Sequence, residues 1–144
     1  MKFAFRFLFL FFAVCPSGLR AGDDVPVSYD QLPKAAQTML QKHFPGKKVA
    51  LAKMEKGFFK KSYDVILTTG EKLEFDSDGN WTEIKCRRSA VPPSLIPHPV
   101  REYVLRKHSG SHVCKMEKED KKLEIQLSDK TKLKFSRNFK VKKK

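Results

Sequence analysis

The chain has 144 residues and a formal net charge of +14, from 30 basic and 16 acidic side chains. This length is that of one domain or two very small ones, which excludes larger multidomain architectures. Beyond the first 21 residues, no apolar stretch approaches the roughly 20 residues that a membrane-spanning helix requires, which excludes a helical membrane protein as the mature form.

Residues 1–21 are predicted to be a signal peptide that is removed on export. A short basic start is followed by nine consecutive apolar residues at 7–15, too few to span a bilayer, and Ala21 offers a small residue for cleavage. Lipoprotein processing at Cys15 is a minor alternative. That signal prefers a small residue directly before the cysteine, whereas this chain has Val14 there. We therefore expect a periplasmic or secreted protein.

The mature chain opens with a predicted helix followed by a sheet. Pro33 suits the first turn of a helix, where its missing N–H costs nothing, and Pro45-Gly46 ends a stripe of apolar residues at helical spacing. A first strand begins near Val49. Alternating polar and apolar residues predict three further strands joined by short turns, at 63–68, 72–76 and 81–86. Connections this short require antiparallel neighbours.

A predicted linker at residues 89–95, which contains two prolines, precedes a second copy of the same pattern. A helical stripe that includes Val100, Tyr103 and Val104 stops at Ser109-Gly110. Val113 begins the following strand. Further strands are predicted at 123–128, 133–135 and 139–142.

Residues of similar character recur at constant spacing, which indicates an internal duplication. Five pairs lie 64 positions apart, and three lie 60 apart after one change of register. The pairs are Pro33 and Pro97, Met39 and Tyr103, Leu40 and Val104, Gly46 and Gly110, Val49 and Val113, Leu67 and Leu127, Leu73 and Leu133, and Phe75 and Phe135. The predicted fold class is therefore α+β. Two tandem units, at 22–88 and 96–144, each pack a short helix on a four-stranded antiparallel sheet.

Three motifs of the first copy follow one another in a familiar order. They are Leu-Pro-x-x-Ala-Gln at 32–37, Phe-Pro-Gly at 44–46 and Phe-Asp-x-x-Gly-Asn-Trp at 75–81. Together they resemble the PepSY-like, β-lactamase-inhibitor-like family of exported bacterial proteins, closely over 28–86 and more loosely over 91–142. The resemblance implies tandem helix-plus-sheet units and a periplasmic or secreted location. It does not imply inhibition of a β-lactamase, because fold does not determine function.

Two clusters contain residue types that bind metals, but an ordinary structural role explains both better. Residues 76–80 offer oxygen atoms at alternate positions, but the sixth and twelfth positions hold Trp81 and Arg87 where a calcium loop needs Gly and Glu. A hairpin turn explains the same residues. The second cluster lacks a fourth ligand for zinc or copper, and consists of His108, His112 and Cys114. No metal or cofactor is predicted.

The chain has no linear signature of an enzyme. No nucleophile elbow, zinc-protease motif or phosphate-binding loop occurs, so we expect a non-enzymatic protein. Cys86 and Cys114 remain after export. A disulfide between them and two buried thiols are both compatible with the sequence.

Positive charge is concentrated in the second copy. Residues 91–144 carry 15 basic and 6 acidic side chains, against 12 and 10 in residues 22–90. Lys130, Lys132 and Lys134 alternate along a predicted strand and should share a face. They form either a patch for a polyanion or acidic protein, or a solvated face whose lysines discourage edge pairing. Nucleic acid is not an expected partner of an exported protein.

Phe58 and Phe59 lie between two predicted strands, where a hairpin tip would expose them as interface anchors. Trp81 is instead expected to be buried beneath the helix. The leading hypothesis is a binding module for an unidentified envelope protein or ligand. A more specific version of this hypothesis is that the module inhibits an extracytoplasmic enzyme. Its expected contacts are Phe58, Phe59, Lys132 and Lys134. The alternative is an envelope protein that binds polyanions through its basic second copy.

Overall fold

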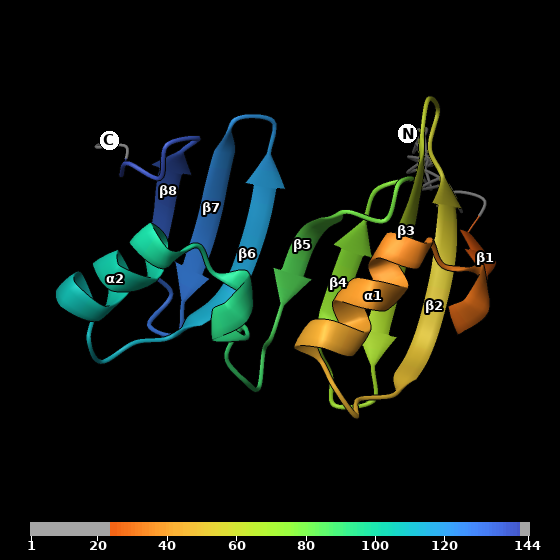
Figure 1. The fold of residues 1–144 in the computed structure, drawn as a ribbon, viewed down its shortest axis with the longest axis horizontal. Coiled ribbons are helices and arrows are strands. Elements are labelled where there is room, and N and C mark those ends of the chain that lie inside the picture. The colour runs from red at the N-terminus through yellow and green to blue at the C-terminus, as the bar shows by residue number, and fades with distance from the viewer. Residues whose placement is uncertain (1–23, 142–144) are drawn as a thin grey trace, which may run out of the picture.

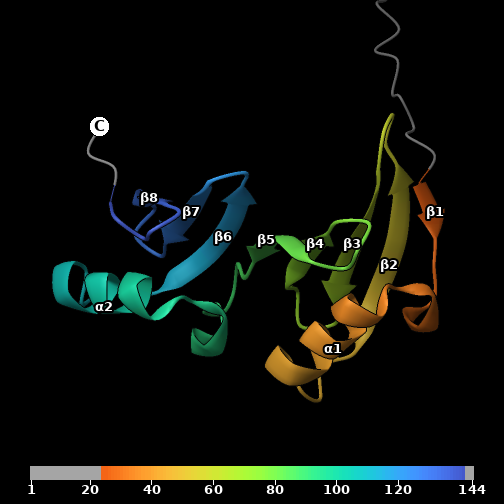
Figure 2. The same ribbon diagram turned by 45° about the horizontal axis from the view of Figure 1, so that its top comes forward.

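The computed structural model describes residues 24–141; the predicted signal peptide with Cys15 lies outside this range, as do the last three lysines. Figure 1 shows a single antiparallel sheet with two helices, and Figure 2 places both helices on the same face of it. The strands are β1 (Asp24–Pro26), β2 (Val49–Lys56), β3 (Lys61–Leu67), β4 (Lys72–Phe75), β5 (Trp81–Lys85), β6 (Val113–Glu119), β7 (Lys122–Leu127) and β8 (Lys132–Ser136). No helix among these residues is long and apolar enough to cross a membrane.

The eight strands follow one another across the sheet in chain order. The two predicted sheets are joined edge to edge, because β5 pairs with β6 through Glu83 opposite Glu117, Ile84 opposite Met116 and Lys85 opposite Lys115. The predicted α+β fold of two similar helix-plus-strand units is confirmed. Joining the units removes two exposed sheet edges, which would otherwise be free to pair with other chains.

The duplication is visible in the backbone as well as in the side chains. The strand that follows the helix in each unit is irregular at equivalent positions, between Val49 and Leu51 in β2 and between Val113 and Lys115 in β6. The units differ at their last strand. The strand predicted at 139–142 is reduced, within the described residues, to an isolated bridge between Val141 and Phe135.

The helices, α1 (Lys34–His43) and α2 (His98–Lys107), begin after Pro33 and Pro97. Each has ten residues, which is marginal in isolation, so packing on the sheet supplies most of its stability. Two short 3₁₀ turns precede them, η1 (Tyr29–Gln31) and η2 (Pro93–Leu95). Buried residues from α1, α2 and the sheet form the core, with Phe75 and Phe135 fully buried at equivalent places.

One buried acidic side chain joins three loops of the first unit. Glu71 is only 2% exposed, and its carboxylate accepts hydrogen bonds from Lys47 and Thr69. Ser89 Oγ, at the start of the predicted linker, donates to the same carboxylate at 3.2 Å. Glu71 therefore stabilises the loop after α1, the β3–β4 turn and the segment that leaves the first unit.

Candidate functional site

The β2–β3 hairpin presents two phenylalanines at its tip. Gly57 N donates to the Lys60 carbonyl at 3.0 Å, and a Cβ on Gly57 would lie 2.7 Å from that oxygen, so a side chain there would force the turn to shift. Phe58 and Phe59 occupy the two positions between them and are 95% and 90% exposed. Their rings meet edge to face with centroids 4.8 Å apart. The prediction that a hairpin tip exposes both side chains is confirmed.

Lysines surround this aromatic tip. Lys56 and Lys61 are directly opposite each other on β2 and β3, and Lys60 is next to Phe59. Figure 1 and Figure 2 both show the hairpin extending past the neighbouring strand ends. Burying one such phenylalanine is worth roughly 1.5–3 kcal/mol, which the isolated chain does not gain. The tip is therefore a surface suited to an apolar pocket with an acidic rim.

The sheet face opposite the helices carries two adjacent rows of charge. Strand register places acidic side chains in one row, formed by Asp64, Glu74, Glu83, Glu117 and Glu124. The neighbouring row is mainly basic and contains Lys72, Lys85, Lys115 and Lys132. Ion pairs join the rows, as between Lys115 Nζ and the carboxylates of Glu117 at 2.8 Å and Glu83 at 3.5 Å. Much of the charge on this face is thus paired within the protein.

The predicted lysine patch is less uniform than its spacing suggested. Lys130 precedes β8 in a turn with φ of 69°, so the prediction that it belongs to the strand is wrong. Lys132 and Lys134 do share the open face, but Lys134 lies 3.0 Å from the Glu124 carboxylate. That hydrogen bond raises the pKa of Lys134. Of the three lysines, Lys134 therefore offers the least unpaired charge to a partner.

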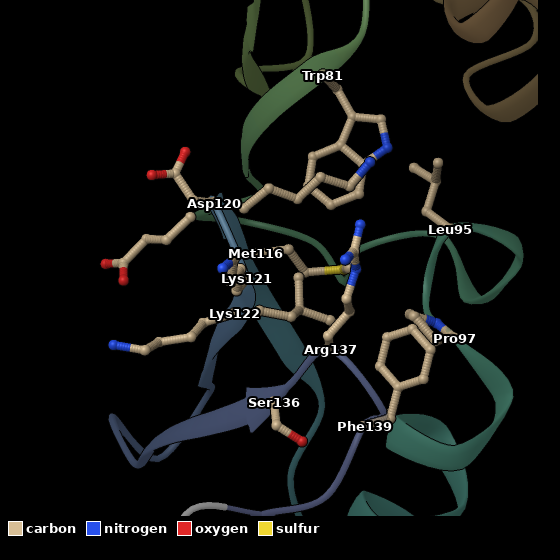
Figure 3. Close-up of a pocket in the computed structure, with 13 residues that line it drawn as sticks. Trp81, Leu95, Pro97, Met116, Asp120, Lys121, Lys122, Ser136, Arg137 and Phe139 are labelled. Atoms are coloured by element: carbon tan, nitrogen blue, oxygen red, sulfur yellow. The ribbon is translucent and has the colours of Figure 1, made fainter.

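A groove between Trp81 of β5 and the second unit was not predicted from the sequence. Its volume is about 470 Å³, and Figure 3 shows the residues that border it. Its apolar walls come from β5, the η2 region, β6, β7 and the turn after β8, and consist of Trp81, Leu95, Pro97, Met116, Leu123 and Phe139. Its polar lining is Lys118, Glu119, Asp120, Lys121, Lys122, Ser136 and Arg137.

A strand irregularity directs Trp81 toward this groove. Register shifts within the β4–β5 pair, so Trp81 lies opposite Phe75, and Glu83 lies opposite Glu74. Simple alternation would have placed Trp81 and Glu83 on one face, whereas the extra residue turns Trp81 to the helix side. Trp81 is only partly buried and borders the groove, so the expectation that it lies buried beneath the helix is wrong.

Two cations face the apolar walls of the groove. Lys118 Nζ lies 3.7 Å from the centroid of the Trp81 ring, and desolvation there lowers the pKa of Lys118. Figure 3 shows the Arg137 side chain extending toward Trp81. Among residues 24–141, neither cation has a carboxylate within ion-pairing distance.

The two units differ at one equivalent position that borders the groove in the second unit. Gly79, with φ of 86°, lies so close to α1 that a Cβ would come within 2.7 Å of Pro33 Cβ and 2.8 Å of Ala36 N. Sixty positions later the residue is Phe139, with φ of 56°. The Phe139 ring forms one wall of the groove. The sequence signal was this glycine-to-phenylalanine change at the repeat spacing.

The Asp76–Asn80 segment forms the hairpin turn that its sequence also predicted. Asp76 Oδ1 accepts hydrogen bonds from Asp78 N at 3.0 Å and Asn80 N at 2.9 Å, and Oδ2 faces the Asn80 amide at 3.4 Å. The Asp76 carboxylate therefore holds its own turn through Oδ1. Within the described part of the chain, no three His, Cys, Asp or Glu side chains gather as metal ligands.

Both cysteines of the described chain are free thiols on neighbouring backbone segments. Cys86 N donates to the Cys114 carbonyl at 2.8 Å. Cys86 is buried, and desolvation raises its pKa to about 11. A thiol with so high a pKa is almost entirely protonated near neutral pH and is a poor nucleophile. Of the two alternatives left open by the sequence, the structure shows unlinked cysteines.

Comparison with known proteins identifies relatives along nearly the whole chain. The family described as "Putative beta-lactamase-inhibitor-like, PepSY-like" matches residues 22–59 and 61–143. No curated protein shows a significant match.

Three solved structures show the same fold. A "putative calcium-regulated periplasmic protein" of Bacteroides thetaiotaomicron is 43% identical, with a TM-score of 0.82, covering 84% of this chain and 95% of its own. A "putative periplasmic protein" of the DUF2874 family from Bacteroides vulgatus is 45% identical, with a TM-score of 0.82, covering 85% and 97%. A second Bacteroides vulgatus protein, of unknown function, is 37% identical, with a TM-score of 0.79, covering 83% and 97%.

The three relatives are all described as periplasmic, in agreement with the location predicted from the sequence. The similarity extends across both units and includes the segments that carry the Leu-Pro, Phe-Pro-Gly and Phe-Asp-x-x-Gly-Asn-Trp motifs. The chain belongs to the PepSY-like, β-lactamase-inhibitor-like family.

Proposed function

We propose that this protein is a non-enzymatic periplasmic binding module that contacts a partner protein through Phe58 and Phe59. The observation that carries the proposal is the exposure of both side chains, 95% and 90%, on a projecting hairpin. Large exposed aromatic side chains are unfavourable in water and are frequent anchors of protein interfaces. The periplasmic location of the relatives supports the compartment.

The surroundings of the tip define the chemistry of the partner. Lys56, Lys60 and Lys61 would face acidic side chains around an apolar pocket that receives the two rings. More specifically, the partner would be an extracytoplasmic enzyme whose activity falls when Phe58 and Phe59 fill its pocket. The family's inhibitor-like description is compatible with this form, although it refers to similarity and not to a measured inhibition.

The test compares three baits in a pull-down from envelope extract, washed at low and high salt. The baits are the wild-type exported protein, Phe58→Ala/Phe59→Ala, and Leu105→Ala, which removes a 65% exposed apolar side chain elsewhere. A defined protein should survive the high-salt wash on wild type and Leu105→Ala and be lost from the double variant. Retention by all three baits would count against the hairpin tip as the contact.

A polyanion-binding function through the second unit is the alternative, favoured by its 15 basic against 6 acidic residues. Polyanion affinity falls steeply as salt rises, whereas an aromatic contact should be nearly independent of salt. Charge reversal at Lys130, Lys132 and Lys134 should abolish heparin binding if this alternative holds. Unchanged heparin binding by that triple variant would remove it.

The Bacteroides thetaiotaomicron relative is described as calcium-regulated. In this chain, the Asp76 oxygens are engaged by the N–H groups of the same turn.

A further inference from the structure

The groove beside Trp81 has the dimensions of a small-molecule site and is separate from the aromatic hairpin tip. Its volume of about 470 Å³ falls inside the range of roughly 300–1,000 Å³ that is typical of ligand pockets. Six apolar residues line it together with seven polar ones, so it can take a ligand that has both an apolar part and a charged part. Nothing in the contact proposed for Phe58 and Phe59 depends on it.

The apolar walls converge from distant parts of the chain. Trp81 belongs to the first unit, whereas Leu95, Met116 and Phe139 belong to the segment after it, and Figure 3 shows Trp81 and Phe139 at opposite ends of the groove. Phe139 has φ of 56°, a left-handed conformation that is unfavourable for a residue with a Cβ. Strained residues of this kind concentrate at binding sites.

The charges within the groove select an anion. Arg137 extends into the space beside Trp81, and the Lys118 ammonium lies over the Trp81 ring. Neither cation is neutralised by an ion pair in the described chain. Glu119 and Asp120 also line the groove, and Figure 3 shows Asp120 directed away from it. These two acids would repel a ligand with several negative charges.

We propose that this groove binds an amphiphilic monocarboxylate of the medium-chain fatty acid class. The carboxylate would be held by Arg137, whose planar guanidinium can donate two parallel hydrogen bonds, and by Lys118. The alkyl chain would lie against Trp81, Leu95 and Phe139, where removal of its methylene groups from water favours binding. Such a ligand has one apolar chain and one negative charge, which match the apolar walls and the two cations of the groove.

Trp81 is the single tryptophan of the chain, so its fluorescence reports directly on the groove. The test titrates the purified exported protein with decanoate and, separately, with decanol, both below the concentration at which they aggregate. Decanoate should change the Trp81 emission in a saturable way, and decanol should bind about tenfold more weakly or worse because it lacks the charge. Absence of a saturable change with decanoate, or equal affinity for decanol, would overturn the proposal.

Two variants and one matched control assign the effect to the groove. Arg137→Gln should weaken decanoate binding about tenfold or more and leave decanol binding unchanged. Lys42→Gln removes a cation from α1, outside the lining of the groove, and should bind decanoate like wild type. Phe139→Gly restores the residue of the first unit, removes one wall and should weaken both ligands. Wild-type decanoate affinity in Arg137→Gln, with the fold verified by circular dichroism, contradicts the assignment.

Discussion

Two equivalent turns have the same backbone hydrogen bonds but different surfaces. They follow β4 in the first unit and β8 in the second. In the first, Asp76 N donates to the Asn80 carbonyl at 2.9 Å and Gly79 N to the Asp76 carbonyl at 3.0 Å. In the second, the bonds from Ser136 N to Lys140 O and from Phe139 N to Ser136 O measure 2.9 Å and 2.8 Å. The turn with glycine lies against α1, and the turn with phenylalanine borders the groove.

A second pair of turns repeats the comparison. Gly70, with φ of 97°, and Lys130, with φ of 69°, are equivalent, and their N–H groups donate to Leu67 and Leu127 at the same 2.9 Å. The second unit has thus lost glycine at two left-handed positions and has kept both conformations. The hydrogen bonds and the strands on either side hold the turn, and glycine only lowers its cost.

The largest expected effect comes from giving the first unit the residue of the second. Gly79→Phe places a side chain where a Cβ already meets Pro33 and the α1 backbone, at 2.7 and 2.8 Å. Overpacking and backbone strain together should lower the free energy of unfolding by about 3–5 kcal/mol, measured by urea denaturation. Gly70→Lys is the control, since no atom lies within 4 Å of a Cβ there, and it should cost only about 1 kcal/mol. Equal losses would show that the close approach to α1 is unimportant.

The buried carboxylate of Glu71 sharpens the comparison, because the equivalent residue in the second unit is Thr131. Burial acts to raise the pKa of Glu71, but hydrogen bonds from Lys47 and Thr69 outweigh it and hold this pKa below the ordinary value of 4.5. The ionised form is therefore stabilising above that ordinary value, and this stabilisation is lost as pH falls through the lowered folded-state pKa.

Glu71→Gln should lower the free energy of unfolding at pH 7 by about 2 kcal/mol, a value reduced from that of a fully buried pair because Lys47 is one-third exposed. Denaturation curves at several pH values should show the difference from wild type shrinking below pH 4.5, the ordinary carboxyl value. Glu102→Gln, at a side chain 64% exposed on α2, should show little effect at any pH. A pH-independent deficit in Glu71→Gln would exclude the ionised carboxylate as its cause.

Restoring glycine in the second unit should have a smaller effect of opposite sign. Lys130→Gly relieves the left-handed conformation of an exposed residue and should raise the free energy of unfolding by about 1 kcal/mol. Thermal unfolding followed by circular dichroism would register this as a higher midpoint. A lower midpoint would mean that the Lys130 side chain makes a favourable contact that outweighs the strain.

The smallest effect is expected at the seam between the units. Glu83 on β5 lies 3.3 Å from Lys85 Nζ and 3.5 Å from Lys115 Nζ on β6. Because these pairs lie at a solvent-facing surface, Glu83→Gln should cost less than about 1 kcal/mol and less still in high salt. A larger, salt-independent loss would show that the charges on the open face, and not the backbone pairing of β5 with β6, hold the two units together.

Local patterns in the sequence were sufficient for the duplication, the two helices, most strands and the exposure of Phe58 and Phe59. Each of these depends on neighbouring residues, such as proline at a helix start, alternation along a strand or a short turn between strands. The β5–β6 junction, the inward turn of Trp81, the pairing of Lys134 with Glu124 and the groove at Phe139 were decided only by the tertiary structure. They depend on strand register and on distances between segments far apart in the chain, and a shift of one residue in register reverses which face a side chain occupies.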